Sequence, residues 1–278
     1  MCGHCGCSSD SGVTFDGKTR FQPLSRSPNT MSPLTTAHHH DNLQPDIAAH
    51  IAAHGGSTSS IVQLEIDLLS KNNEYAERNR KRLGDARILS LNLLSSPGSG
   101  KTTLLERSIA DLSDAEEIYV VEGDQATQRD ATRIRRAGAT AVQVNTGSGC
   151  HLEADMLDQA LDLLNPTAES LLFIENVGNL VCPALFDLGE NHRVVVLSVT
   201  EGEDKPLKYP TMFNRADLIV INKIDLLPYV DFDLQKCINE ARKLNPNAQI
   251  ISLSATTGEG LQRWYDWIQQ QKGLLAAS

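Results

Sequence analysis

The sequence predicts an α/β fold with a mostly parallel sheet, preceded by a helix and by a flexible N-terminal segment. From residue 85 onward, short apolar runs alternate with stretches of helical character. The runs, such as ILSLNLL at 88–94, are apolar on both faces, which is typical of parallel strands covered by helices on both sides. We therefore divide the chain into an N-terminal segment, 1–60, a helix, 61–84, and an α/β domain, 85–278.

Residues 8–60 are rich in Ser, Thr, Pro, Gly and His and poor in large aliphatic side chains. Such a segment buries too little apolar surface to offset the loss of chain entropy, so we expect a flexible linker. The composition changes at residue 61. A partial apolar stripe at helical spacing follows, formed by Ile61, Leu64, Leu68, Tyr75 and Leu83. We expect one long helix here, packed on the domain that follows.

Strands and helices then alternate along the rest of the chain. We expect strands at 88–94, 118–124, 141–145, 171–176, 193–200, 217–222 and 248–254. Helices are expected at 100–112, 125–138, 151–164, 231–244 and 259–271. A chain of this length can bury a sizeable core, and one medium-sized domain with extensions accounts for it.

The 278 residues carry a formal net charge of −10, which disfavours a nucleic-acid backbone as partner. No apolar run approaches the roughly 20 residues that span a bilayer, and the N-terminus lacks the pattern of a secretory signal. We therefore expect a cytoplasmic protein without a membrane partner. In a reducing compartment, the six cysteines favour metal binding or catalysis over disulfides.

A glycine-rich loop, SSPGSGKTT at 95–103, lies between an expected strand and an expected helix, the context that a phosphate-binding P-loop requires. Backbone amides of such a loop surround the β-phosphate, and the helix N-terminus adds a favourable dipole. Lys101 would bridge the β- and γ-phosphates, and the Thr102 hydroxyl would bind Mg²⁺. The general motif begins with Gly, where this chain has Ser95. The expected nucleotide-binding residues here are Gly98, Ser99, Gly100, Lys101, Thr102 and Thr103.

The motif NKID at 222–225 follows a later expected strand. A carboxylate at Asp225 can accept hydrogen bonds from the ring N–H and the exocyclic amine of guanine, a donor pair that adenine lacks. A site built on such hydrogen bonds rejects the wrong ligand by roughly 10⁴-fold or more. With SAT at 254–256 after the last strand, the motif predicts GTP rather than ATP. The expected contacts are Asn222, Lys223, Asp225, Ser254 and Ala255.

Acidic residues end two of the expected strands beside the phosphates. Glu122 and Asp124 end one strand, and Glu175 ends another, shortly before Gly178. We expect Glu175 beside Mg²⁺, the Gly178 amide at the γ-phosphate, and Asp124 orienting the attacking water or holding the metal. The catalytic set is therefore Lys101, Asp124 and Glu175, and the magnesium set is Thr102, Asp124 and Glu175. Because Asn179 stands where a water-positioning glutamine is familiar, we expect slow intrinsic hydrolysis.

Cys150 and His151 stand at the start of an expected helix, whose N-terminus would favour the thiolate form of the cysteine. Cys182 follows the expected γ-phosphate loop. Thiolates and an imidazole suit Zn²⁺ or Ni²⁺, and a complete site would also need Glu153, water or a dimer partner. Spacing alone leaves open that both cysteines are simply small buried residues. Cys237 lies within an expected helix and is assigned to the core.

The first seven residues, MCGHCGC, form a second candidate metal site from Cys2, Cys5 and Cys7. A redox-active C-x-x-C pair would sit beside a strand within a βαβ unit, whereas these cysteines precede a long linker. Closely spaced thiolates fit a compact, square-planar Ni(II) site. His4 and the terminal amine are open choices for its fourth ligand.

Taken together, these residues resemble the HypB-type GTPases, the nickel-insertion factors of NiFe-hydrogenase maturation. The resemblance runs from residue 61 to the C-terminus, and the N-terminal cysteines are matched separately. It rests on SSPGSGKTTLLE, EGDQAT, QVNTGSGCHLEA, FIENVGNLVCPA, VTEGEDKPLKYP, NKIDLLPY and SATTGEG. The family tolerates serine at the first P-loop position, as at Ser95.

The resemblance implies a dimerising P-loop GTPase that uses GTP, GDP and Mg²⁺ and has two sites for Ni²⁺ or Zn²⁺. The matched ligands are Cys2, Cys5 and Cys7 in a nickel site, and Cys150, His151 and Cys182 in a nickel or zinc site. The implied partners are a second copy of the chain, a zinc-binding HypA-type accessory protein and, through it, the NiFe-hydrogenase large subunit. If the second metal site lies near the γ-phosphate, each ligand must change the other's affinity by the same factor.

Two other functions stay open on the sequence. An accessory GTPase for another nickel enzyme, such as a urease, would use the same parts, although CxxCGC and the Cys150–His151 pair favour hydrogenase. A nickel-storage or sensing protein with a decayed GTPase is disfavoured by the intact Lys101, Thr102 and NKID. The linker histidines fit either a weak metal reservoir or a simple polar linker; they are His38, His39, His40, His50 and His54.

Overall fold

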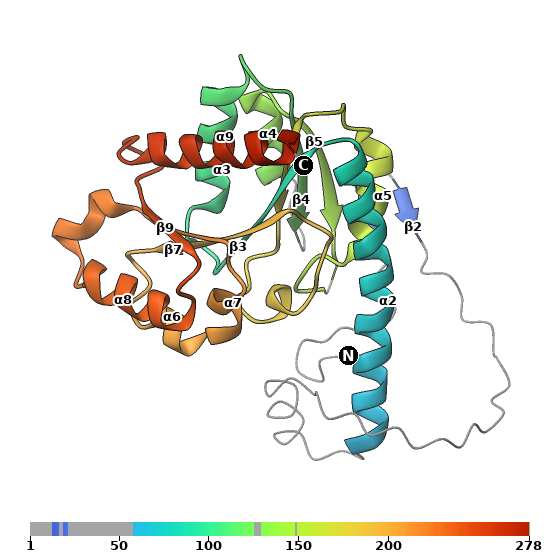
Figure 1. Ribbon diagram of the computed structural model, residues 1–278, viewed down its shortest axis with the longest axis horizontal. Helices are drawn as coiled ribbons and strands as arrows, with labels where there is room; N and C mark the ends of the chain where they lie inside the picture. The colour runs from blue at the N-terminus through green and yellow to red at the C-terminus, as the bar shows by residue number, and fades with distance from the viewer. Residues whose placement is uncertain (1–12, 17–18, 22–57, 125–128, 148, 278) are drawn as a thin grey trace, which may run out of the picture.

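The computed structural model describes residues 13–16, 19–21, 58–124, 129–147 and 149–277 (Figure 1). Within these residues, nine strands form one sheet in the order β2-β1-β5-β4-β6-β3-β7-β8-β9. They are β1 (Val13–Phe15), β2 (Thr19–Phe21), β3 (Leu89–Ser95), β4 (Ile118–Asp124), β5 (Thr140–Asn145), β6 (Leu171–Glu175), β7 (His192–Ser198), β8 (Leu218–Asn222) and β9 (Gln249–Ser252). Strands β3 to β9 pair in parallel, which confirms the predicted α/β fold.

Helices cover both faces of this sheet (Figure 1). One face carries α3 (Lys101–Leu112), α4 (Arg129–Ala137) and α9 (Leu261–Ala277). The other carries α2 (Thr58–Asp85), α5 (Ala154–Leu164), α7 (Pro210–Asn214) and α8 (Leu234–Leu244). Short helical turns connect them, namely η1 (Cys182–Ala184), α6 (Lys205–Lys208) and η2 (Ile224–Tyr229). Among the helices so described, none has the length and apolarity needed to cross a bilayer.

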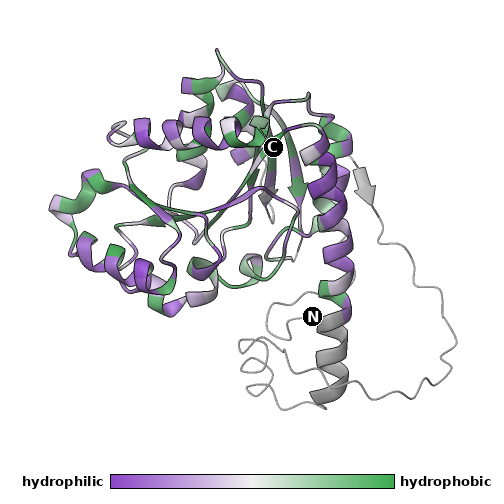
Figure 2. Cartoon of the chain, viewed as in Figure 1, coloured by the Kyte–Doolittle hydropathy of each residue, from purple (hydrophilic) through white to green (hydrophobic). Residues whose placement is uncertain are grey.

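The long helix α2 packs on the domain through a stripe that differs from the predicted one. Leu83 is buried as expected, but Leu68 is exposed. Two asparagines, Asn72 and Asn79, are buried instead, and Asn79 Nδ2 donates to the Ala154 backbone oxygen at 2.8 Å. Both polar atoms of the Asn72 amide are hydrogen-bonded, whereas the Asn79 oxygen has no partner among the described residues. The stripe is therefore partly polar, and the part of α2 that is coloured in Figure 2 is largely hydrophilic.

A short hairpin lies within the segment that we expected to be linker. Strand β1 pairs antiparallel with β2 and with β5, and Phe15 on β1 is buried against the sheet. The expectation of a linker throughout 8–60 is therefore wrong for the described residues 13–16 and 19–21, and also for 58–60, where α2 has already begun. Three residues with one aromatic side chain are too short to show strand periodicity, and the pairing comes from β5, far away in the sequence.

Candidate nucleotide and metal sites

The glycine-rich loop turns at the carboxyl end of β3 and leads into α3. Gly98 and Gly100 have φ angles of +80° and +93°, in the left-handed region that favours glycine. A Cβ on Gly100 would lie 2.5 Å from Asn222 Nδ2, so only glycine lets the loop approach the NKID segment this closely. The local sequence therefore explains both the shape of the loop and its contact with β8.

Asn222 joins the three segments that we expected to contact the nucleotide. Its Nδ2 donates to the Ser99 backbone oxygen at 3.0 Å. Its Oδ1 accepts the backbone amides of Lys223 at 2.7 Å and Ala255 at 3.1 Å. Lys223 Nζ donates to the Gly98 backbone oxygen at 2.7 Å. The P-loop, NKID and SAT are thus held in one frame by hydrogen bonds among the predicted site residues.

Asp225 offers the acceptor that a guanine base would need. It lies in η2, just after Lys223, whose φ of +64° turns the chain out of β8. Within the described part of the chain, the buried Asp225 Oδ1 has no hydrogen-bond donor. Leaving such a group unpaired costs about 1–3 kcal/mol, and more when it is charged. The two adjacent N–H donors of guanine would satisfy this carboxylate.

The predicted phosphate and magnesium residues meet at the start of α3. Lys101 Nζ lies 3.0 Å from Ser95 Oγ and 4.0 Å from Glu175 Oε1. The Thr102 hydroxyl donates to the same Glu175 oxygen at 2.7 Å, while Glu175 Oε2 is buried and unpartnered among the described residues. Burial raises the pKa of Glu175, and the Lys101 charge acts against that rise. A hydroxyl beside a carboxylate fits Mg²⁺, which prefers oxygen ligands.

Glu122, rather than Asp124, lies opposite Glu175 in the register of β4 and β6. Burial raises the pKa of Glu122 to about 9, and the neighbouring charges of Glu175 and Asp124 add to the rise. Asp124 lies further along β4, level with Asn145 on β5, so its catalytic role stays a prediction. From the sequence, Glu122 is one of two acidic residues at the end of this strand and has no assigned role. Its position one strand away from Glu175 follows from strand order, which the sequence alone does not show.

Two further loops touch the P-loop. A Cβ on Gly178 would lie 3.2 Å from Pro97, which places the predicted γ-phosphate segment against the loop. Glu201 accepts the Ser198 amide at 2.9 Å and hydrogen-bonds with the Ser96 hydroxyl. Glu201 is not among the residues that the sequence predicts for the site. The available signal was the motif VTEGEDKPLKYP, to which no role was given.

Cys150, His151 and Cys182 converge in the fold, as predicted for a metal site. One ligand atom from each lies within 4.8 Å of the others, and all three side chains are half-buried. Cys150 Sγ is 3.7 Å from His151 Nδ1, and Glu153 Oε1 is 3.8 Å from His151 Nε2. The His151 ring stacks on Phe186 with centroids 3.9 Å apart. Thiol and imidazole donors in this arrangement suit Ni²⁺ or Zn²⁺.

One predicted feature of this cluster is wrong. Helix α5 begins at Ala154 with Glu153 as its N-cap, so Cys150 lies in the preceding loop and not at the helix N-terminus. A hydrogen bond with Cys182 raises the pKa of Cys150 to about 12, and partial burial adds to the rise. Because metals bind the thiolate, metal binding here releases protons. Cys237 is fully buried, as predicted, within the core beneath α8.

The N-terminal candidate site falls outside the described residues. This applies to Cys2, Cys5 and Cys7 and to the linker histidines, His38, His39, His40, His50 and His54. Their roles therefore stay predictions.

The fold and the site define a class of protein. A parallel sheet carries a P-loop, a paired threonine and glutamate, and an NKID turn with an unpartnered carboxylate, which together characterise a P-loop protein built for a guanine nucleotide. Consistent with this, residues 90–252 match the family profile described as "CobW/HypB/UreG, nucleotide-binding domain".

Comparison with individual proteins narrows the class. The hydrogenase maturation factor HypB of Escherichia coli K12 is 57% identical over 220 residues, 79% of this chain and 76% of that protein. HypB of Azotobacter vinelandii is 48% identical and covers 98% of this chain and 93% of its own length. A crystal structure of HypB from Helicobacter pylori in complex with nickel matches with a TM-score of 0.68 and 42% identity, over 73% of this chain and 95% of that one. The chain belongs to the HypB hydrogenase maturation factors, GTPases of the CobW/HypB/UreG family, which confirms the resemblance found in the sequence.

Proposed function

We propose that this protein binds nickel and hydrolyses GTP to drive nickel insertion during maturation of a NiFe-hydrogenase. The observation that carries the proposal is the sharing of one segment by two sites. Residues 175–182 run from the carboxylate beside Thr102 to a ligand of the Cys–His cluster. The crystallised relative from Helicobacter pylori binds nickel. A metal and a nucleotide bound here would therefore act on the same few residues.

Hydrolysis would proceed by positioning and charge stabilisation. Lys101 would neutralise charge on the β- and γ-phosphates, and Thr102, Glu175 and Asp124 would hold Mg²⁺. When bound, Mg²⁺ neutralises charge that develops on the phosphate oxygens. Asp124 would also orient the attacking water. Since no glutamine follows Gly178, we expect slow turnover.

Nickel would be cargo at two places. Cys2, Cys5 and Cys7 would form the N-terminal nickel site, and the Cys150, His151 and Cys182 cluster would take Ni²⁺ or Zn²⁺. A γ-phosphate and a metal in the cluster would both act on residues 175–182. The binding free energies of nucleotide and metal would therefore be linked reciprocally. Hydrolysis then makes metal release directional. In this scheme GTP closes a dimer and alters the cluster so that nickel passes onward.

The partners would be a second copy of the chain, a zinc-binding HypA-type protein and the hydrogenase large subunit, in the cytoplasm. Support comes from the names of the relatives, which are hydrogenase maturation factors. Deleting the gene and assaying hydrogenase and urease separately tests this assignment. Loss of hydrogenase activity alone is the expected result, and loss of urease activity alone would contradict it.

The guanine assignment is tested by Asp225→Asn. Xanthine carries an oxygen where guanine carries the exocyclic amine, so an asparagine amide can donate to it. We expect GTP affinity to fall by roughly 10²-fold or more, since a site built on specific hydrogen bonds rejects a mismatched base. Affinity for xanthosine triphosphate should rise. Unchanged preference for GTP in a titration with both nucleotides would sink the assignment.

A further inference from the structure

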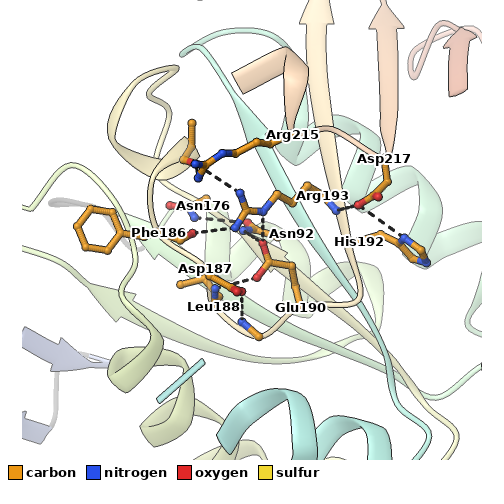
Figure 3. A network of polar contacts seen from close by, with 12 residues as sticks. Asn92, Asn176, Phe186, Asp187, Leu188, Glu190, His192, Arg193, Arg215 and Asp217 are labelled. Carbon is orange, nitrogen blue, oxygen red and sulfur yellow. Dashed lines mark hydrogen bonds and ion pairs between the residues drawn. The ribbon is translucent and has the colours of Figure 1, made fainter. Parts of the chain in front are cut away.

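A series of hydrogen-bonded polar side chains runs from the end of β6 past β3 to β7 (Figure 3). It begins at Asn176, which directly follows Glu175 at the end of β6 and is 2% exposed. Asn176 Oδ1 accepts the backbone amides of Leu152 at 3.1 Å and Val177 at 2.9 Å. A single carbonyl oxygen therefore holds both the residue after His151 and the segment that leads to Gly178.

The series continues through the central strand. Asn176 Nδ2 donates to Asn92 Oδ1 at 3.4 Å, and Asn92 Nδ2 donates to Glu190 Oε1 at 3.1 Å. Asn92 is fully buried on β3, the strand that ends in the P-loop, and it pairs with Ile174 on β6 and Arg193 on β7. An apolar side chain is the usual occupant of such a position. An amide there is costly unless its hydrogen bonds are made, and here they are.

Glu190 carries the connection to the second loop of the metal cluster. It accepts the Leu188 amide at 2.8 Å and Arg193 Nε at 2.8 Å. The Arg193 guanidinium donates in turn to the backbone oxygens of Ala184 at 3.4 Å and Phe186 at 3.3 Å. Ala184 ends the helical turn that begins at Cys182, and the Phe186 ring stacks on His151. Figure 3 shows the side chains of Asn92, Asn176, Glu190 and Arg193 pointing toward one another.

We propose that Asn176 is a positioning residue that couples the nucleotide site to the Cys–His cluster. When the backbone at the end of β6 moves, the hydrogen bond from the Leu152 amide to the Asn176 carbonyl oxygen moves the loop of Cys150 and His151 with it. The Asn176 amide nitrogen transmits the same backbone movement through its hydrogen bond to Asn92, and from Asn92 through Glu190, to the loop that follows Cys182. The positions of both loops of the cluster therefore depend on Asn176, the residue next to Glu175. This inference rests on the proposed linkage between metal and nucleotide and names the residues that carry it.

The structure supplies a matched control for this role. Asn79 on α2 is another fully buried asparagine, and its Nδ2 donates to the backbone oxygens of Ala154 at 2.8 Å and Leu188 at 3.0 Å. It therefore joins the start of α5, just after the loop of Cys150 and His151, to the loop that follows Cys182, but from α2 and away from β6. A merely structural contribution should be lost equally in Asn79→Ala and Asn176→Ala. Coupling should be lost only in Asn176→Ala.

The experiment uses the full chain with Cys2, Cys5 and Cys7 replaced by serine, so that nickel reports on one cluster. Nickel affinity is measured with GDP and with a non-hydrolysable GTP analogue, and the coupling factor is the ratio of the two affinities. We expect a ratio of at least about fivefold in this parent, the low end of allosteric coupling. Asn176→Ala should bring the ratio toward one while GDP affinity stays within about twofold, and Asn79→Ala should keep the ratio.

Each outcome decides between the two proposals. A ratio near one in the parent overturns the proposed linkage and the role of Asn176 with it. A normal parent ratio that Asn176→Ala retains overturns the role of Asn176 alone. Equal loss of the ratio in Asn79→Ala also overturns it, because a general loosening of the loops would then suffice. If Asn176→Ala does not fold, the same affinity ratio is measured in Asn92→Leu. This substitution removes the hydrogen bonds that join Asn176 to Glu190.

Discussion

The nucleotide site and the metal cluster are built differently. The P-loop residues are neighbours in sequence, and Asn222 locks them to NKID and SAT with hydrogen bonds of 2.7–3.1 Å. The metal cluster joins two loops, and its ligand atoms lie only within 4.8 Å of one another. Its loops are held from outside, by Asn176, Glu190 and Arg193. The nucleotide site is held by hydrogen bonds among its own residues, whereas the metal cluster is held by residues outside it, through which we propose that it responds to the nucleotide.

The largest effect is expected on GTP turnover, at the nucleotide site. Lys101→Ala removes the charge at the β- and γ-phosphates, so GTP turnover should fall by about 10²–10³-fold, as when one transition-state donor is lost. Steady-state phosphate release measures this. Lys81→Ala, at an exposed ion pair with Asp85, is the control and should leave turnover unchanged. Comparable loss in both variants would contradict the assignment.

A smaller but selective effect is expected at the metal cluster. Cys150→Ser or Cys182→Ser removes a ligand, and nickel affinity of this cluster should fall by roughly 100-fold, since even outer partners are worth 10–100-fold. Nickel titration in the variant lacking the N-terminal cysteines measures it. Cys237→Ala, in the buried core, should keep the affinity. If Cys237→Ala weakened nickel binding as much as Cys150→Ser, the cluster would be misassigned.

The loop that follows Cys182 approaches α2 closely at Gly189, so a substitution there tests how far this loop depends on α2. Its φ is +85°, and a Cβ there would lie 2.2 Å from the Ala76 backbone oxygen on α2. Gly189→Ala should therefore destabilise the fold by about 2 kcal/mol, through backbone strain and displacement of the loop. Gly273→Ala in α9 meets nothing within 4 Å and should stabilise by up to about 1 kcal/mol. Chemical denaturation compares the two, and equal effects would contradict the close approach.

The last effect is a pH dependence of stability that comes from Glu122. Its folded pKa of about 9 exceeds the usual value of 4.5, so the folded state holds an extra proton between these pH values. Stability from this group is present at low pH and is lost as pH rises toward 9, with a slope of at most about 1.4 kcal/mol per pH unit. Glu122→Gln should flatten the fall in thermal stability between pH 6 and 9, measured with a chelator present. Parallel curves for the two proteins would argue against this burial.

The same contrast explains what the sequence could predict. Residues of the P-loop, NKID and SAT were all placed together correctly, because each motif is local and its geometry follows from its residue types. Cys150, His151 and Cys182 were also predicted, from ligand chemistry. The start of α5 and the pKa of Cys150 were not, because both depend on the loop before Ala154 and on a thiol from another segment.

Polar residues in the interior escaped prediction for a related reason. Asn72 and Asn79 on α2 and Asn92 on β3 are buried, although asparagine is usually found at the surface. Their partners are backbone groups or side chains brought near by strand order and helix packing. Hydrophobic periodicity does not register such positions. The residues through which we propose that the two sites are coupled are therefore ones that only the structure reveals.

The proposed link between nucleotide and metal runs through residues 175–182. It is tested most directly by measuring nickel affinity of the Cys150–His151–Cys182 cluster with GDP and with a non-hydrolysable GTP analogue, in the full chain without its N-terminal cysteines. We predict affinities that differ by at least about fivefold, with the reciprocal change in nucleotide affinity when nickel is bound. Identical nickel affinities in the two nucleotide states would contradict the account.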